Sequence, residues 1–379
     1  MRFRRFWRRP LPEVPAWEEF LPLEGLLRAQ VEDVLVIHDR QASDRAVAFG
    51  GELTMAPRRA VALLRDRLRP FGYTPFLRRD RGKTWVQALP LAQVTTEPNP
   101  LVNLLLFAAT VFTTLLAGAH YLAEIPLAEL ARQPSRLVAG VPFSLSLLAI
   151  LLAHELGHYT LGRRHGLPIT LPYFIPVPPP FLVGTMGAFI KLRGPIRDRE
   201  SLFDMAVAGP LAGLVLAVPL FIVGLRLSEI VPLDPSEEVS IVLGPSLASW
   251  WLVQTVLGPI PAGHGVDLHP TAVAAWFGFF VTALNLLPVG QLDGGHLAYA
   301  LLGRRHRLIS QIGFALVLLL GLFFWPGWIV WGVLLLAIGL QHTPTMDDIT
   351  PLDPSRRLLG YFALVLLLLL LPPVPLVVR

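Results

Sequence analysis

Residues 141–158 read Val-Pro-Phe-Ser-Leu-Ser-Leu-Leu-Ala-Ile-Leu-Leu-Ala-His-Glu-Leu-Gly-His, an apolar run that carries no charge before Glu155. It ends in two histidines, His154 and His158, four residues apart. On a helix such residues point in directions about 40° apart, so both imidazoles can reach one metal ion. Glu155 lies beside that ion, where it can hold and deprotonate a water molecule. Ionisable groups are costly at membrane depth, so this pattern predicts a functional site.

The composition of the chain predicts a membrane protein. Of its 379 residues 53% are hydrophobic, and the mean hydropathy is +0.57. A membrane-spanning helix needs about 20 apolar residues. Suitable segments are 102–123, 139–162, 203–225, 271–288, 308–325, 327–341 and 358–375, of which the sixth is short. We expect an all-α polytopic membrane protein with about six to seven transmembrane helices.

The chain contains no cysteine. Disulfides, a thiol nucleophile and sulfur ligands to a metal are therefore excluded. A zinc ion would have to be held by histidine and carboxylate side chains.

Residues 1–98 predict a small soluble α+β domain with a basic N-terminal tail at Met1–Arg9. Strands are expected at 32–38 and 45–49, a helix at 57–68 and a closing hairpin at 73–77 and 84–88. The tail resembles the start of a signal peptide, but no apolar segment follows before residue 101, so we expect no cleaved signal. Arginines on the helix could suggest nucleic acid. No base-stacking aromatic pattern accompanies them, so we predict no nucleic-acid partner.

The distribution of charge predicts the orientation in the membrane, because Lys and Arg favour cytoplasmic loops. With residues 1–98 in the cytoplasm, the second span ends inside at Arg163 and Arg164. The loop 227–270 lacks Lys and Arg and lies outside. We expect a multi-pass protein of the cell (inner) membrane, with an active site that opens to the cytoplasm. Residues 99–310 would form the catalytic core and 311–379 the C-terminal helices.

Two histidines need a third protein ligand to complete a catalytic zinc site. The candidate is Asp293, in Leu292-Asp293-Gly294-Gly295, on the same predicted side of the membrane as the end of the histidine helix. The glycines allow the backbone to pack close to another helix. Asn285, a polar residue within a span, either orients the site or contacts substrate, or it bonds a neighbouring helix; we favour the first.

Four motifs in order resemble the site-2 protease family of intramembrane zinc metalloproteases. They are His154–His158, the glycine-containing segment Gly184–Ile190, the helix segment Phe203–Gly213, and Asn285 followed by Leu292–Gly295. The resemblance covers roughly residues 100–310 and is nearest to the bacterial, cyanobacterial and plastid branch without PDZ or CBS domains. That branch carries Gly-Asn-Leu-Arg in its soluble region, where this chain has Gly51-Glu52-Leu53-Thr54.

The resemblance implies an enzyme that hydrolyses peptide bonds in or near transmembrane segments of membrane-protein substrates, as in regulated intramembrane proteolysis. Its Zn²⁺ would be bound by His154, His158 and Asp293, with water in the fourth place. Glu155 would take the proton from that water and pass it to the leaving amine. The partners would be a membrane-protein substrate and the lipid bilayer.

Residues 169–192 predict a re-entrant β-hairpin-like segment. The prolines at 176 and 178–180 exclude a helix there, and 184–192 alternates like a strand. An exposed edge could pair with an unwound substrate. The candidate substrate-binding residues are Gly184, Thr185, Met186, Gly187 and Ala188. The alternative is a buried loop that merely packs near the site; we favour substrate pairing.

Other polar and small residues are expected to be structural. Gly209 and Gly213 have the spacing of a helix-packing face. Asp204 fits a capping box at the start of the third span. His296 lies three residues beyond Asp293, close enough to support the metal ligands, but we favour a helix-surface histidine. His342 has no predicted role.

Two other functions are compatible with buried His and Asp residues. A metal or proton transporter should show repeated halves, and the sequence shows none. A catalytically silent scaffold would not need Glu155. The substrate, the oligomeric state and the role of residues 1–98 stay open.

Overall fold

The computed structural model describes residues 24–43, 46–90, 99–233 and 241–378. The predicted basic tail at Met1–Arg9 lies outside these residues. The described chain forms two compact units. One contains the region before residue 97 together with residues 194–200 and 343–352, and the other contains the long apolar helices.

The smaller unit is a four-stranded antiparallel sheet with one long helix. The strands are β1 (Leu35–Ser43), β2 (Ala46–Leu53), β3 (Tyr73–Asp80) and β4 (Lys83–Pro90), in the order β1-β2-β4-β3. The predicted helix is confirmed as α2 (Pro57–Leu68), with proline in its first turn. Its buried face consists of Ala60, Val61, Leu64 and Leu68, which recur at helical spacing and pack on the sheet. The predicted hairpin is likewise confirmed as β3 and β4.

Two later segments of the chain continue this sheet beyond β3. Asp347 forms parallel bridges with Leu77 of β3 and with Asp198. The Leu77 amide donates to the Met346 carbonyl at 2.7 Å, and the Asp347 amide donates to the Arg197 carbonyl at 2.8 Å. These bridges were not predicted from the sequence, because an isolated bridge between short segments has no periodic pattern.

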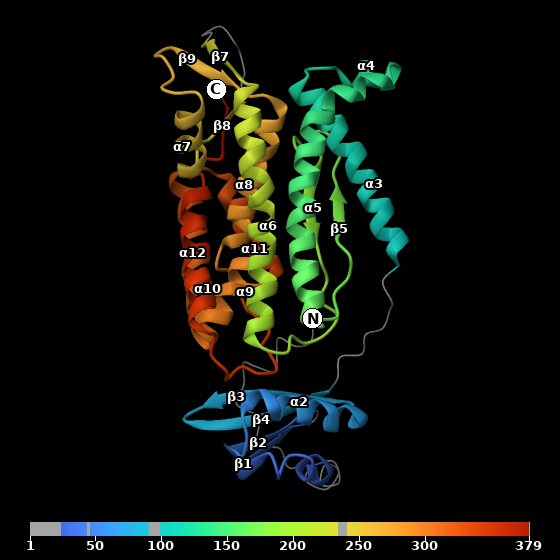
Figure 1. Ribbon diagram of the computed structural model, residues 1–379, viewed down its shortest axis with the longest axis vertical. Helices are drawn as coiled ribbons and strands as arrows, with labels where there is room; N and C mark the ends of the chain where they lie inside the picture. The colour runs from blue at the N-terminus through green and yellow to red at the C-terminus, as the bar shows by residue number, and fades with distance from the viewer. Residues whose placement is uncertain (1–23, 44–45, 91–98, 234–240, 379) are drawn as a thin grey trace. The chain divides into compact units, whose positions relative to one another are not determined.

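The larger unit is a bundle of apolar helices (Figure 1). Its helices are α3 (Pro100–Ala117), α4 (Leu127–Arg132), α5 (Val141–Arg164), α6 (Arg199–Arg226), α7 (Leu247–Val256), α8 (Pro270–Leu286), α9 (Asp293–Leu302), α10 (His306–Phe323), α11 (Gly327–Ile338) and α12 (Pro354–Leu370). Four helical segments are long and apolar enough to cross a membrane: Pro100–Leu122, Pro134–Arg164, Arg199–Arg226 and Asp293–Phe323. α8 and α11 are apolar but shorter. A mostly helical chain with four candidate membrane spans among the described residues is thus confirmed, whereas six to seven spans stay a prediction.

The segment between α5 and α6 forms the predicted β-hairpin. Strand β5 (Tyr173–Pro176) pairs antiparallel with β6 (Thr185–Phe189). The hairpin lies between α3 and α5 (Figure 1). Asn103 of α3 holds its entry, because the side-chain amide donates to the carbonyls of Leu171 and Pro172 at 3.1 and 2.8 Å.

The loop 227–270 contains structure that the sequence analysis did not predict. Strand β7 (Glu229–Pro232) pairs with β9 (His264–Asp267), and β8 (Ile241–Leu243) pairs with β10 (Leu376–Val378). The predicted capping box at Asp204 is wrong, since α6 begins at Arg199. Asp204 instead accepts two hydrogen bonds from Arg356 of α12, each 2.7 Å long, and it joins α6 to α12.

The buried Asp347, which bridges to β3, makes a testable prediction. The Asp347 carboxylate is buried and accepts hydrogen bonds from the Ile349 amide, the Thr350 amide and the Thr350 hydroxyl. Asp347→Ala leaves those donors without a partner, at a cost of about 1–3 kcal/mol. Hydrogen–deuterium exchange should therefore speed up at Leu77. Asp66→Ala, which removes an exposed carboxylate of α2, is the matched control. Equal protection of Leu77 in both variants would contradict the assignment.

Candidate metal centre

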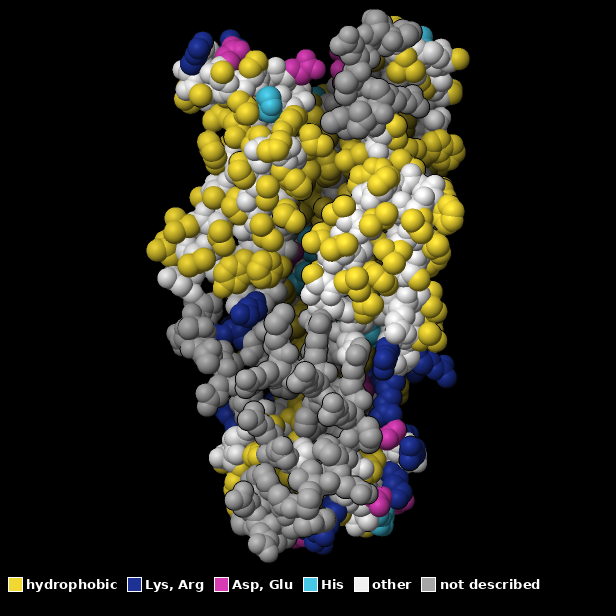
Figure 2. Space-filling model, turned by 180° about the vertical axis from the view of Figure 1, so that it is seen from behind, with side chains coloured by type: hydrophobic (Ala, Val, Ile, Leu, Met, Phe, Trp, Pro, Cys, Tyr) yellow, Lys and Arg dark blue, Asp and Glu magenta, His cyan; other side chains and the backbone are white. Residues whose placement is uncertain are grey.

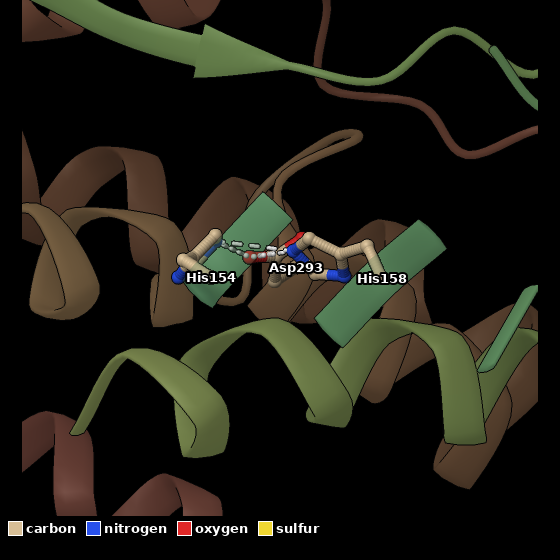
Figure 3. Close-up of side chains that lie close together, drawn as sticks. All are labelled: His154, His158 and Asp293. Carbon is tan, nitrogen blue, oxygen red and sulfur yellow. Dashed lines mark hydrogen bonds and ion pairs between the residues drawn. The ribbon is translucent and has the colours of Figure 1, made fainter. Parts of the chain in front are cut away.

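Two of the predicted ligands lie one turn apart on α5 and are buried. The Nε2 atoms of His154 and His158 are 3.1 Å apart. Each lies 3.2 Å from Oδ2 of Asp293, which comes from α9. Figure 3 shows the three side chains converging on one point from these two helices. Zinc ligands at 2.0–2.1 Å in a tetrahedral site are about 3.3 Å apart, so the spacing suits one zinc ion.

Asp293 is the first residue of α9 and follows a tight turn after α8. A Cβ at Gly294 would come within 1.9 Å of the Leu286 carbonyl, and a Cβ at Gly295 would come within 2.5 Å of the Gly290 carbonyl. Larger residues would therefore separate α9 from the end of α8. The predicted need for glycine beside Asp293 is confirmed, and the close packing brings the carboxylate to the histidines.

The hydrogen bonds of the cluster leave a place for a cation. Nδ1 of His158 lies 2.7 Å from the carbonyl oxygen of Met205 on α6. A carbonyl only accepts hydrogen bonds, so Nδ1 carries a proton, and in the neutral ring Nε2 would present a lone pair. Oδ2 of Asp293 is buried and has no hydrogen-bond partner. A metal ion would stabilise such converging lone pairs of nitrogen and oxygen, and two histidines with one aspartate form a ligand set that zinc accepts.

Helix α6 packs directly on the ligand-bearing helix. Gly157 of α5 approaches α6 closely, because a Cβ there would lie 2.5 Å from the Ala208 carbonyl. A Cβ at Gly209 would lie 2.1 Å from Nε2 of His158, whereas a Cβ at Gly213 would lie 3.4 Å from His154. Helix packing by the small-residue face was predicted. The structure adds that Gly209 leaves room for a ligand imidazole.

Asn285 of α8 also faces the cluster. Its Nδ2 lies 3.2 Å from Nε2 of His154. This contact joins α8 to the neighbouring helix α5 at a ligand atom, so it fits both interpretations of Asn285, and a role in orienting the site or contacting substrate stays a prediction. An amide donor next to the ligand atoms is suited to hold an oxygen atom bound at the same place.

Glu155 is buried beside the two histidines on α5, and its carboxylate is not one of the clustered ligand atoms. The side chain of Asp293 keeps 16% of its surface exposed. Figure 2 shows a furrow between apolar surfaces in which acidic and histidine side chains are visible. The ligands are therefore set within the apolar bundle without being sealed off from its exterior.

The five predicted substrate-binding residues divide into two groups. Gly184 and Thr185 contact the protein's own backbone. A Cβ at Gly184 would lie 2.4 Å from the Thr113 carbonyl, and the Thr185 hydroxyl donates to the Ile175 carbonyl. Met186, by contrast, is 57% exposed. Gly187 has open space around its Cβ position, and Ala188 is half-buried. Of the five predicted residues, Met186 is therefore the most exposed, and Gly184 and Thr185 are buried.

Some residues at the site were missed or misread by sequence. His296 was expected on the helix surface, but its Nδ1 lies 2.6 Å from Nε2 of His342, for which no role was predicted. The Met205 carbonyl carries no signal in a sequence, because any residue supplies one. His342 could have been found only by knowing that the chain after α11 returns to α9.

Comparison with known proteins indicates a family of zinc peptidases. Residues 142–325 match the model of peptidase family M50. The chain is 33% identical over 239 residues to the probable zinc metalloprotease EGY1, chloroplastic, of Arabidopsis thaliana, which covers 60% of this chain and 42% of that protein. It is 28% identical over 369 residues to the probable zinc metalloprotease EGY2, chloroplastic, of Oryza sativa subsp. japonica, which covers 90% and 64%. The chain thus spans less than half of the Arabidopsis protein. No solved structure matches it.

The packing of α6 on the ligands predicts a sharp difference between two glycine variants. Gly209→Ala should displace the His158 ring and lower zinc affinity by about 100-fold, as expected when a ligand loses its support. Gly213→Ala places its methyl group at ordinary contact distance and should bind zinc like the wild type. Zinc affinity is measured by competition with a chromophoric chelator on the purified protein. Unchanged affinity of Gly209→Ala would show that the His158 ring is not fixed against α6.

Proposed function

We propose, since residues 142–325 belong to peptidase family M50, that this chain is an intramembrane zinc metalloprotease. The family match and the relatives agree with the resemblance inferred from the four sequence motifs. The observation that carries the proposal is the cluster of His154, His158 and Asp293, with ligand atoms 3.1–3.2 Å apart within a bundle of apolar helices.

A zinc ion held by these three residues would polarise a peptide carbonyl and lower the pKa of a bound water. Glu155 directly follows the ligand His154 in the sequence and is buried, so few solvent molecules compete for its carboxylate. It accepts the proton of the attacking water and then delivers this proton to the leaving amine nitrogen. The carbonyl oxygen gains negative charge during attack, and the Asn285 amide, 3.2 Å from His154, is placed to donate a hydrogen bond to it.

The substrate class follows from the surroundings of the site. A transmembrane helix hides its peptide bonds in its own hydrogen bonds, so a protease must extend it locally. Strand β6 pairs with β5 on one side, and among the described residues no strand pairs with its other side. An extended segment of substrate can add to that edge, with Met186 and Gly187 accessible to its side chains.

The proposal includes a location and partners. The enzyme would be a multi-pass protein of the cell membrane, with the soluble unit and the opening of the site on the cytoplasmic side, in accordance with the charge of the loops. Its partners would be membrane proteins with a transmembrane segment and the lipid bilayer, and it would bind no nucleic acid. A silent scaffold would not need a buried carboxylate next to the ligands, and a transporter should show repeated halves, which the sequence lacks; both points favour hydrolysis.

Replacement of the base tests the proposal. Glu155→Gln keeps the size of the side chain but cannot accept the proton, so cleavage should fall by about 10²–10⁴-fold while zinc content is unchanged. Quantitative membrane proteomics of a native host that carries either form should reveal accumulated membrane stubs in the variant. Cleavage at the wild-type rate would exclude Glu155 as the base, and identical proteomes would favour the scaffold.

The hairpin makes a separate prediction. Ala188→Pro removes an amide hydrogen from β6 and should lower cleavage at least about tenfold, because it weakens pairing along that strand. Zinc content should stay at the wild-type value, since Ala188 is not a ligand. Equal loss of zinc and of cleavage would mean that the hairpin serves only the architecture of the site.

A further inference from the structure

Residues 339–342 follow α11 and lead to the smaller unit. They contact the chain both before and after Asp293. This 339–342 segment contributes no metal ligand. We infer that it supports the metal ligand Asp293, and that His342 is the positioning residue that does so. The inference rests on the proposed metal site but not on proteolysis.

His342 holds the helix that begins at Asp293. Its Nε2 lies 2.6 Å from Nδ1 of His296, and its ring stacks on Tyr299 with centroids 4.2 Å apart and planes 16° apart. His296 and Tyr299 are three residues apart and share one face of α9. A single imidazole therefore fixes the first two turns of the ligand-bearing helix in rotation and in distance.

The same segment also holds the turn that precedes Asp293. The Ser310 hydroxyl of α10 donates to the Leu340 carbonyl at 2.8 Å and accepts the Gly290 amide hydrogen at 3.0 Å. Ser310 is fully buried. Gly290 has a φ of +58°, and a Cβ there would lie 2.3 Å from the Gly339 carbonyl, so the two backbones touch. Residues on both sides of Asp293 thus depend on residues 339–342.

This support has a chemical consequence. Oδ2 of Asp293 receives no hydrogen bond that could orient it toward the histidines. Its position is set by the backbone of α9 and the turn, and these are fixed by His342 and Ser310. Groups that orient metal ligands typically change metal affinity by about 10–100-fold when they are replaced. His342 should therefore act on zinc affinity, although the sequence places it far from the ligands.

Three variants separate positioning from packing. His342→Phe keeps a ring beside Tyr299 but cannot hydrogen-bond His296, and zinc affinity should fall by about 10–100-fold. His342→Gln restores a hydrogen-bonding group and should bind zinc within about threefold of the wild type, since it loses the ring contact alone. The control is His120→Phe. His120 also bonds a neighbour, the Ile125 carbonyl, and packs on Tyr121 at 4.5 Å, but it lies on another helix, and its loss should leave affinity unchanged.

The measurement is competition for Zn²⁺ alone between the full-length purified protein and a chromophoric chelator, together with the unfolding temperature of the metal-free protein. If His342 positions the ligand, His342→Phe should bind zinc more weakly and unfold at a temperature close to that of the wild type. His342→Gln should bind zinc nearly as the wild type does. Equal affinity of wild type and His342→Phe would overturn this inference alone. Weaker binding in Phe and Gln variants alike, with a lower unfolding temperature, would assign His342 to packing and also overturn it.

Two further outcomes are decisive. If His342→Phe does not fold, Ser310→Ala tests the same support from the other side of Asp293, and it should weaken zinc binding by about tenfold. Unchanged affinity in Ser310→Ala would then overturn the inference. A wild-type protein that binds no zinc would overturn the proposed function and this inference together.

Discussion

The structure depends on the convergence of three lone-pair donors in an apolar bundle. Two imidazole nitrogens and a carboxylate oxygen meet within 3.2 Å, and the hydrogen bond between Nδ1 of His158 and the Met205 carbonyl leaves Nε2 of that ring facing the other two atoms. Such an arrangement is unfavourable in a medium of low dielectric constant unless a cation joins the three atoms. A zinc ion that joined these atoms would also be the Lewis acid that peptide hydrolysis needs.

The surrounding fold serves this requirement through close backbone contacts. Gly157 and Gly209 bring α5 and α6 together around His158, while Gly294 and Gly295 bring α9 against the end of α8. These glycines are placed where a methyl group would push a ligand away. Side chains thus serve as the ligands, and close backbone contacts at glycines set the distances between them.

The sequence predicted the parts of the site that have a pattern of their own. His154, Glu155 and His158 follow from spacing on one helix, and Asp293 follows from the need for a third ligand beside glycines. The helix at 57–68 and both hairpins followed from periodicity and turn residues. His342, Ser310 and the Met205 carbonyl could not be predicted, because their importance lies in tertiary contacts between distant segments. For the same reason the bridges of Asp347 to Leu77 and Asp198 were missed.

Zinc K-edge X-ray absorption of the purified protein examines the three-residue zinc site itself. We expect one zinc ion with about four nitrogen or oxygen neighbours near 2.0–2.1 Å, including the scattering pattern of two imidazoles, and no sulfur. Asp293→Ala should lose the metal or change the first shell. A protein that binds no zinc, or an Asp293→Ala spectrum identical to that of the wild type, would contradict this zinc site.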